Sequence, residues 1–301
     1  MSDNNQYGLI GLGQMGLPIC QRMSQIAKVR AFDIDPARRA MADGIEHVDT
    51  TDAIGSLTEC SRIVLSLPNP AISQSVVEEL APQLAPETVL IETSTVLPSH
   101  ARHLERVANR YGVHVVDAAI LSGVDQMSSG TATLLVGGAP NDIEKIGDLL
   151  SVLGPSGSER FGALGAGMAA KVVNNAISHA VMVVLTEAFA LSQSQDLDLG
   201  QIAQMLMQSD GGLKRPMDYR MAERVANADF EGGMPLEAAR KDSTLALALA
   251  EESGVPLFAT QAAHTAYELG VAEGLGRQDY SAIALLWEKW TGDSLQFGGE
   301  S

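Results

Sequence analysis

Short apolar runs alternate with segments of helical periodicity through the first half of the chain. The runs have the length of buried strands, and the segments between them carry apolar residues at the three- and four-residue spacing of helices. This alternation predicts a mostly parallel sheet with helices on both faces. The expected strands are residues 7–12, 29–33, 62–67, 88–92, 113–118 and 133–136. The expected helices are residues 17–27, 71–84, 99–111 and 142–153, with a short one opening at Pro36.

The pattern changes after Gly154-Pro155, and almost no strand signal follows Gly167. Ala- and Leu-rich helical segments take its place, so the second part of the chain is predicted to be all-helical. The expected helices are residues 168–194, 199–208, 216–227, 236–253, 256–270 and 281–290. We therefore predict an α/β domain over residues 1–164, an all-α domain for substrate binding and oligomerisation over residues 165–291, and a flexible tail over residues 292–301.

Composition narrows the class of protein. The chain has 301 residues and a formal net charge of -17, which argues against binding to nucleic acid or to an anionic membrane surface. Cys20 and Cys60 form no disulfide framework and are predicted to be buried thiols. No group of His, Cys or carboxylate residues has metal-site spacing, so no metal is expected.

The first residues lack the basic region and small-residue cleavage site of a signal peptide, which predicts a cytoplasmic protein. The longest uncharged helical stretch, residues 172–186, is shorter than the ~20 apolar residues that a membrane span needs. It also carries Asn174, Asn175, Ser178 and His179, so a buried helix fits it better.

A glycine-rich turn follows the first expected strand and opens the first expected helix. It reads Gly11, Leu12, Gly13, Gln14, Met15, Gly16. In this context Gly11 permits a tight turn, Gly13 lets a pyrophosphate approach the backbone, and Gly16 lets helix and strand pack closely. The helix N-terminus adds N–H groups for the anion. The turn predicts a Rossmann-type dinucleotide-binding domain.

Asp33 ends the second expected strand, near the offset of about 20 residues at which a carboxylate binds the ribose hydroxyls. A carboxylate there repels a 2′-phosphate, so we expect NAD rather than NADP. Arg38 and Arg39 follow closely, and either Arg could pair with a 2′-phosphate. NADP therefore remains the less favoured alternative.

Lys171 and Asn175 lie four residues apart and share one face of an apolar expected helix. Partial desolvation would lower the pKa of such a Lys and suit it to proton transfer near neutral pH. A Lys near a helix start can instead extend to solvent, and composition alone does not separate the two.

Five motifs in order resemble the β-hydroxyacid dehydrogenase family over nearly the whole chain. They are the turn at residues 11–16, Leu67-Pro68-Asn69-Pro70, Thr93-Ser94-Thr95 with Pro98, residues 165–175, and Lys241-Asp242. The resemblance implies that Lys171 is the catalytic Lys and Asn175 its supporting amide, with Asn174 beside the substrate. It also implies that Leu67, Pro68, Thr95 and Lys241 contact the cofactor.

The substrate loop departs from the family pattern Asp-Ala-Pro-Val-Ser-Gly-Gly. The aligned residues are Asp117, Ala118, Ala119, Ile120, Leu121, Ser122 and Gly123. In the family the Ser and the Gly pair bind the substrate carboxylate, and Leu121 removes one of those donors. Ser122 and Gly123 are expected to take over the carboxylate, which puts the familiar substrates in doubt.

These features together predict an oxidoreductase that interconverts a small 3-hydroxy acid and its oxo or semialdehyde form by hydride transfer with NAD. Lys171 would act as general acid and base. The alternatives are imine reduction, a phosphorylated or sulfonated hydroxy acid as substrate, and a non-catalytic cofactor-binding module. Lys171 argues against imine reductases, which usually lack it, and Lys171 with Asn175 argues against the module. The long helix over residues 168–194 predicts a homodimer or homotetramer, because one side of it should face a second subunit.

Overall fold

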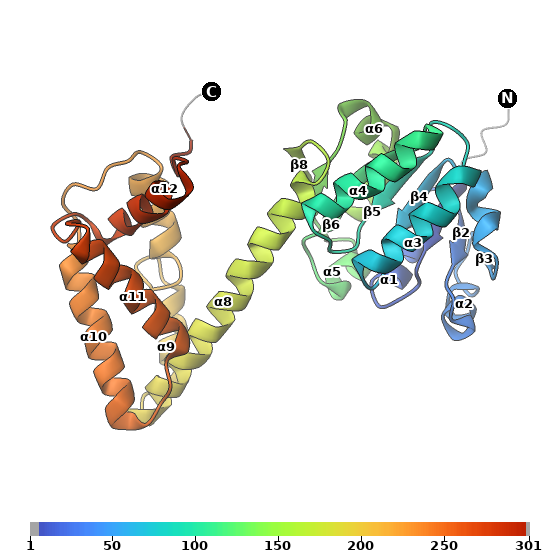
Figure 1. Ribbon diagram of the computed structural model, residues 1–301. Helices are drawn as coiled ribbons and strands as arrows, with labels where there is room; N and C mark the ends of the chain where they lie inside the picture. Colours follow the sequence, from blue (N-terminus) through green and yellow to red (C-terminus); the bar gives the residue numbers. More distant parts are fainter. Residues whose placement is uncertain (1–5, 299–301) are drawn as a thin grey trace. The chain divides into compact units, whose positions relative to one another are not determined.

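The first part of the chain folds around one sheet of eight strands in a computed structural model, which describes residues 6–298 (Figure 1). The strands lie in the order β3-β2-β1-β4-β5-β6-β7-β8, and every neighbouring pair is parallel except β6 with β7. The strands are β1 (Gln6–Ile10), β2 (Lys28–Phe32), β3 (Val48–Thr51), β4 (Arg62–Leu65), β5 (Val89–Glu92), β6 (His114–Ile120), β7 (Leu134–Gly137) and β8 (Ser158–Gly162). The Rossmann-type, mostly parallel sheet predicted from the sequence is confirmed.

Helices pack on both faces of this sheet because successive strand residues point to opposite sides. Leu9, Val64 and Ile91 belong to one core cluster with residues of α1, α2, α6 and α7. Their neighbours Ile10, Ile63 and Leu90 belong to the other, with residues of α3, α4 and the start of α8. These helices are α1 (Gly16–Met23), α2 (Pro36–Ala42), α3 (Pro70–Leu80), α4 (Pro98–Ala108), α5 (Val124–Ser129), α6 (Pro140–Lys145) and α7 (Gly147–Leu153). Three short 3₁₀ turns complete this part: η1 (Ile54–Glu59), η2 (Ala81–Gln83) and η3 (Asn109–Tyr111).

The two cysteines lie inside these layers, as predicted. Cys20 and Cys60 are free thiols and are buried. Burial raises the pKa of Cys20 to about 12 and that of Cys60 to about 11, so both stay protonated. Neither has the exposure or the lowered pKa of a reactive cysteine.

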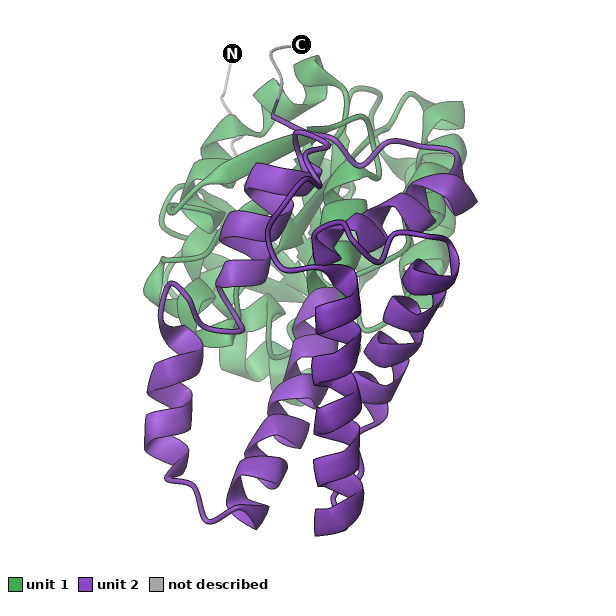
Figure 2. Ribbon diagram, turned by 90° about the vertical axis from the view of Figure 1, so that its left-hand side faces the viewer, with its two compact units in different colours: residues 1–176 green, residues 177–301 purple. Residues whose placement is uncertain are grey.

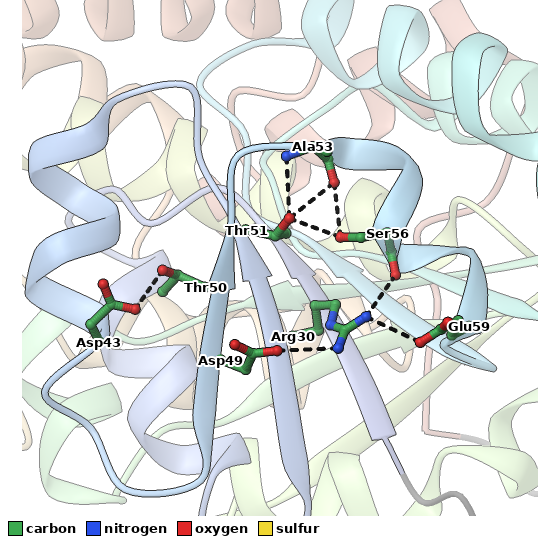
Figure 3. A network of polar contacts seen from close by, with 8 residues as sticks. All are labelled: Arg30, Asp43, Asp49, Thr50, Thr51, Ala53, Ser56 and Glu59. Atoms are coloured by element: carbon green, nitrogen blue, oxygen red, sulfur yellow. Dashed lines mark hydrogen bonds and ion pairs between the residues drawn. The ribbon is translucent and has the colours of Figure 1, made fainter.

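The two outer strands, β3 and β8, were not predicted from the sequence. Strand β3 reads Val-Asp-Thr-Thr and has no buried residue, and β8 is largely exposed, so neither has an apolar repeat. Polar contacts fasten β3 instead (Figure 3). Arg30 of β2 pairs with Asp49 of β3 and with Glu59, both at 3.1 Å. An edge strand held by ion pairs leaves no hydrophobic signature in the sequence.

The chain divides into two compact units, residues 1–176 and 177–301 (Figure 2). Helix α8 (Ala166–Ser194) begins in the first unit and continues in the second. The described residues of the second unit form no named strand, in agreement with the all-helical prediction. Its further elements are α9 (Leu199–Met207), the π-helix η4 (Pro216–Val225), α10 (Leu236–Ser253), α11 (Phe258–Ala272), η5 (Tyr280–Ile283) and α12 (Ala284–Thr291). Part of the predicted tail, residues 299–301, lies outside the described residues, as do residues 1–5 of the segment in which we expected no leader.

A buried carboxylate, Asp279, organises the second unit. It accepts hydrogen bonds from the backbone of Met234 and from Ser281, and it is fully buried. The guanidinium of Arg220 lies 3.1 Å away and that of Arg224 lies 3.7 Å away. These contacts connect η4, η5 and the segment before α10. This part of the second unit is therefore stabilised mainly by polar and charged side chains.

Helix α8 is more exposed than we predicted. We expected a buried helix, but Val173, Ile177 and Met182 are each about 60% exposed. By length and composition alone, α8 is the one described helix that could cross a membrane. This is weak evidence, since core helices of water-soluble proteins meet the same test. The apolar pattern indicates that a face of the helix packs against a partner, but it does not show whether that partner is another segment of the same chain or a second chain.

Candidate active site

A cleft of about 590 Å³ lies at the carboxyl ends of β1, β2 and β4, where ligands bind in sheets of this type. Gly11, Gly13, Gln14 and Met15 of the glycine-rich turn line it. Other lining residues come from the ends of β1, β2 and β4, from α2 and from α3; they are Ile10, Phe32, Asp33, Ile34, Asp35, Arg38, Ser66, Leu67, Pro68, Ile72 and Val76. The sequence placed the turn, Asp33, Leu67 and Pro68 at one site, and the structure brings them together.

Two glycines of the turn are required by its geometry. Gly11 has φ of +98°, and a Cβ there would overlap the carbonyl oxygen of Ser66. A Cβ on Gly16 would overlap the carbonyl oxygen of Gly11. At Gly13 a Cβ would stand 2.9 Å from the guanidinium of Arg38, on a residue that lines the cleft. The turn therefore presents bare backbone to the cleft, as a pyrophosphate requires.

Asp33 connects the turn to the end of β2. Its Oδ2 accepts the N–H of Leu12 at 2.7 Å, and its Oδ1 accepts the N–H of Asp35 at 2.9 Å. The side chain is largely buried at the wall of the cleft. A carboxylate oxygen can accept more than one hydrogen bond, so Asp33 can hold the turn and still accept from ribose hydroxyls.

The two arginines after Asp33 differ in their surroundings. Arg39 donates to the carbonyl oxygens of Asp33 and Ile34 at 2.7 and 3.3 Å. Arg38 lines the cleft, is half exposed, and lies 3.7 Å from Asp35 and 4.0 Å from Asp33. Arg38 is therefore the residue that can reach a ligand in the cleft, whereas Arg39 braces the backbone.

The second wall of the cleft rests on the Thr93-Ser94-Thr95 segment. Ser94 Oγ accepts the N–H of Leu67 at 2.8 Å, and Thr93 donates to the carbonyl of Leu65 at 2.7 Å. Thr95, a predicted cofactor residue, is exposed and is not among the residues that line the cleft. The segment thus contacts the cleft through Leu67.

Lys171 lies near the start of α8, in the same unit as the cleft, and is half-buried. Burial lowers the pKa of its amine below the usual range. Asn175 follows one turn later and is half-buried, while Asn174 is exposed and donates to Asn175 at 3.5 Å. No side-chain hydrogen bond joins Lys171 to Asn175 within the described part of the chain. Lys171 has the lowered pKa that proton transfer requires.

The predicted substrate loop, residues 117–123, begins within β6 and continues beyond the end of that strand at Ile120. Ser122 Oγ accepts the N–H of Thr133 at 3.1 Å, which leaves the hydroxyl proton available to another acceptor. Gly123 is exposed and precedes α5, and Leu121 is 36% exposed. The loop is therefore accessible, with one hydroxyl and one glycine as its polar features.

Lys241 belongs to the second unit, on α10, and it is exposed. It forms an ion pair of 2.9 Å with Asp242. Among the described residues no group of three or more His, Cys, Asp or Glu side chains could hold a metal ion.

Sequence reasoning did not indicate the role of two acidic residues beside this site: Glu92 at the end of β5, which was missed, and Asp117 in β6, which was named only as the first residue of the substrate loop. Both are fully buried. Each acid stands within an apolar strand, Val-Leu-Ile-Glu in β5 and Val-Val-Asp-Ala-Ala-Ile in β6. This pattern was the available signal, because an acid in a buried strand needs hydrogen-bond partners. Ser66, Ile72 and Val76 were also missed, since only their place after β4 and on α3 brings them to the cleft.

Comparison with known families covers both parts of the chain. Residues 6–165 match the family model described as the NAD binding domain of 6-phosphogluconate dehydrogenase. Residues 165–287 match the model described as the NAD-binding of NADP-dependent 3-hydroxyisobutyrate dehydrogenase. The two matches meet at residue 165, which is also the first residue of the glycine-led segment before Lys171.

Individual relatives cover nearly the full length. The chain is 33% identical to 2-(hydroxymethyl)glutarate dehydrogenase of Eubacterium barkeri, over 99% of this chain and 100% of that protein. It is 28% identical to the NAD-dependent L-serine dehydrogenase of Pseudomonas aeruginosa, over 95% and 99%. In fold it is similar to an imine reductase variant from Myxococcus stipitatus solved with NAD+, with a TM-score of 0.84, 20% identity and coverage of 94% and 99%.

Proposed function

The chain belongs to the β-hydroxyacid dehydrogenase family, and we propose that it interconverts a small 3-hydroxy acid and its oxo or semialdehyde form, with NAD as cofactor. One observation carries the proposal: a single unit holds both a glycine-lined dinucleotide cleft and a half-buried Lys with a lowered pKa. The cleft supplies a place for the cofactor, and the Lys supplies an acid or base for the proton that must move with the hydride.

The preference for NAD rests on Asp33 in the wall of the cleft. A carboxylate at this position favours ribose hydroxyls and repels a 2′-phosphate. The similarity to an enzyme named as NAD-dependent agrees with this preference. Arg38 lies at the same wall, but it faces two carboxylates, Asp33 and Asp35, which offset its attraction for a phosphate.

When bound, the nicotinamide cofactor accepts or donates the hydride. The remaining work falls to side chains of the chain. Burial lowers the pKa of Lys171 and so favours its neutral amine, which would accept the proton of the substrate hydroxyl during oxidation. In the reverse direction the protonated amine donates to the developing alkoxide. Asn175, one turn along the same helix, would orient the amine or the substrate.

The substrate carboxylate is assigned to Ser122 and Gly123. The Ser122 hydroxyl proton is available because its oxygen, not its proton, binds the Thr133 N–H. A carboxylate bound there would accept from the hydroxyl and from backbone N–H groups of the loop. Leu121 supplies no donor, so the pocket differs from that of family members with a Ser at this position.

A spectrophotometric screen of 3-hydroxy acids with NAD and NADP in parallel tests the proposal. The panel includes 3-hydroxyisobutyrate, 2-(hydroxymethyl)glutarate and L-serine, with phosphorylated or sulfonated hydroxy acids and cyclic imines as the alternatives. Turnover of a hydroxy acid with NAD is expected. Cofactor binding without any turnover would favour the non-catalytic module, and reduction of imines alone would favour the imine reductase.

Lys171→Ala tests the acid–base assignment. We expect turnover to fall by about 10²- to 10⁴-fold, the range for a lost general acid–base group, with NADH affinity unchanged. The matched control is Lys28→Ala, which removes an exposed Lys at the start of β2. Turnover of the Lys171 variant close to that of the wild type would refute the assignment.

We also propose a homo-oligomer, formed by covering α8 with a second copy of the chain. Exposed apolar side chains recur along this helix at Val173, Ile177, Met182, Val183 and Val184. Exposed apolar side chains in such number mark an interaction site in a protein in water. Size-exclusion chromatography with light scattering is expected to give a dimer or tetramer, and Met182→Glu is expected to weaken it. A stable wild-type monomer would contradict the proposal.

A further inference from the structure

Two buried carboxyl groups lie side by side beneath the proposed site. Glu92 of β5 and Asp117 of β6 are register partners in the sheet, and both are fully buried. Residues two positions earlier, Leu90 and Val115, belong to the same core cluster. Because alternate residues of a strand share a face, Glu92 and Asp117 point to the same side of the sheet, toward α3, α4 and α8.

Asp117 caps the start of α8. Its Oδ1 accepts the N–H of Gly165 at 2.6 Å, and its Oδ2 accepts the N–H of Met168 at 2.7 Å. The first N–H groups of a helix have no partner within the helix, so a carboxylate at this point fixes the helix end. Lys171 follows Met168 by three residues, less than one helical turn. Asp117 therefore fixes the backbone of the helix start from which the Lys171 side chain extends.

Glycines allow the start of α8 to lie this close to the sheet. A Cβ on Gly167 would overlap the carbonyl oxygen of Leu135 in β7, and a Cβ on Gly137 would stand 2.5 Å from Asp117 Oδ1. The first turn of α8 thus lies directly on the backbone of the sheet. A displacement of the carboxylate would be passed to the helix, because no flexible side chain separates the two.

Glu92 supports the wall of the cofactor cleft in a similar way. Its Oε1 accepts the N–H of Ser94 at 2.8 Å, and Ser94 Oγ accepts the N–H of Leu67 at 2.8 Å. Leu67 lines the cleft. Two hydrogen bonds therefore connect the buried carboxyl group to the surface that a cofactor would contact.

The pair differs in its preference for a proton. Burial raises the pKa of Asp117, and the N–H donors at the helix start favour its ionised form and oppose that rise. Burial raises the pKa of Glu92 to about 7, and the neighbouring Asp117 charge raises it further within that shift. The other groups that face Glu92 are the uncharged hydroxyls of Ser73 on α3 and of Ser94. A proton on Glu92 thus avoids two buried charges on adjacent strands.

We propose that Asp117 and Glu92 are a pair of positioning residues, Asp117 for Lys171 through α8 and Glu92 for the cofactor wall through Ser94 and Leu67. Because the two residues are adjacent in the β5–β6 ladder, they hold the proposed acid–base group and the cofactor cleft at a fixed position relative to each other. The inference rests on the proposed function for the role of Lys171. The contacts themselves stand without it, and so do two of the measurements below.

Asp117→Asn tests the first arm. The amide keeps the volume but can accept only one of the two N–H groups, so amide hydrogen exchange at Gly165 or Met168 is expected to accelerate by about tenfold or more. kcat is expected to fall by about 10- to 100-fold, because small displacements of a catalytic group have effects of this size. The dissociation constant of NADH, read by its fluorescence, should stay within about threefold of the wild type.

Glu92→Gln tests the second arm with the opposite pattern. In the wild type, ionisation of Glu92 between about pH 6 and about pH 8 places a second charge beside Asp117 and is expected to weaken NADH binding by about threefold or more. The variant cannot ionise, so its NADH affinity should be independent of pH over that range. Its kcat at saturating cofactor should remain within about threefold of the wild type.

Asp142→Asn is the matched control. Asp142 is a buried carboxylate of the same unit, paired with Lys145 and His114 and remote from the residues assigned to the site. The Asp142→Asn variant should lower the melting temperature but should not change kcat or NADH affinity independently of each other. Equal changes of kcat and affinity in both test variants, or unaltered exchange at Gly165 and Met168 in Asp117→Asn, would overturn the proposal. If no hydroxy acid is turned over, exchange and NADH affinity still decide it, and the proposed function fails separately.

Discussion

The cofactor turn, residues 11–16, follows β1, and the substrate loop, residues 117–123, begins within β6 of the same sheet, yet the two are built differently. In the turn, a Cβ at Gly11 or Gly16 would overlap a backbone carbonyl oxygen, and the N–H of Leu12 is held by Asp33. In the loop, Ala119 is buried, but Leu121 and Gly123 are exposed, and one hydrogen bond from Thr133 fixes Ser122. The first region leaves no room for added side-chain atoms, whereas the second carries exposed side chains.

This difference shows why one cofactor serves many substrates in such folds. A backbone site tolerates few changes, because any added atom meets the main chain. A side-chain site changes its chemistry with each substitution and leaves the sheet intact. The comparison can be tested from both sides, since the two regions should respond to substitution with effects of different size.

Gly16→Ala should produce the largest effect. The added Cβ overlaps the carbonyl oxygen of Gly11, so turn and helix must separate, and NADH affinity is expected to fall by about 100-fold or more. Fluorescence titration measures it, with circular dichroism to verify folding. Gly44→Ala is the control, because a Cβ there meets nothing within 4 Å. Wild-type NADH affinity in the Gly16 variant would show that the turn does not form the cofactor site.

Asp33→Ser should alter cofactor choice. Loss of the carboxylate removes repulsion of a 2′-phosphate and leaves Arg38 at the same wall, so the NAD-to-NADP ratio of kcat/KM is expected to fall by about 100-fold. Steady-state kinetics with both cofactors measures the ratio. The double variant Asp33→Ser with Arg38→Ala should lose most of the gain with NADP. An unchanged ratio in the single variant would contradict the assignment of Asp33.

Leu121→Ser should have a smaller effect, on the substrate side only. The new hydroxyl restores a donor to the loop, and kcat/KM for 3-hydroxyisobutyrate is expected to rise by about tenfold, as for one hydrogen bond to a charged group. NADH affinity should not change. Leu121→Ala separates the new donor from the lost volume. If the Ala variant gains as much as the Ser variant, space rather than hydrogen bonding limits this pocket.

The smallest expected effect is a pH dependence of stability beneath the cofactor wall. The pKa of Glu92 is about 7 in the folded chain and near its ordinary value of 4.5 when unfolded. The folded state therefore holds the extra proton, and the contribution of Glu92 to stability is lost as pH rises toward and through about 7. The melting temperature should fall by about 5 °C as the pH rises from about 4.5 to about 7, and Glu92→Gln should remove this fall. A slope that persists in the variant would assign it to another group.

The elements that could be predicted from the sequence are those whose signal is local. The buried strands, helix α10 and the glycine turn follow from periodicity and from residues adjacent in the chain. The polar edge strand β3, the exposure of α8 and the break of residues 142–153 into α6 and α7 depend on distant partners or on surfaces that the pattern does not name. Lys171 was found through the resemblance to a family, whereas its support from Asp117 comes from a contact across 51 residues.

The cap on α8 has a consequence for the order of folding. Asp117 lies 48 residues before Gly165, and its place is set by β6, which pairs with β5 and β7. The first turn of α8 can be anchored only after those strands have assembled, so we expect this helix end to be stabilised late and to open early. During synthesis the first unit would gain its stable form before the remaining helices emerge. The proposed acid–base residue, Lys171, would then reach its final position only when the sheet is complete.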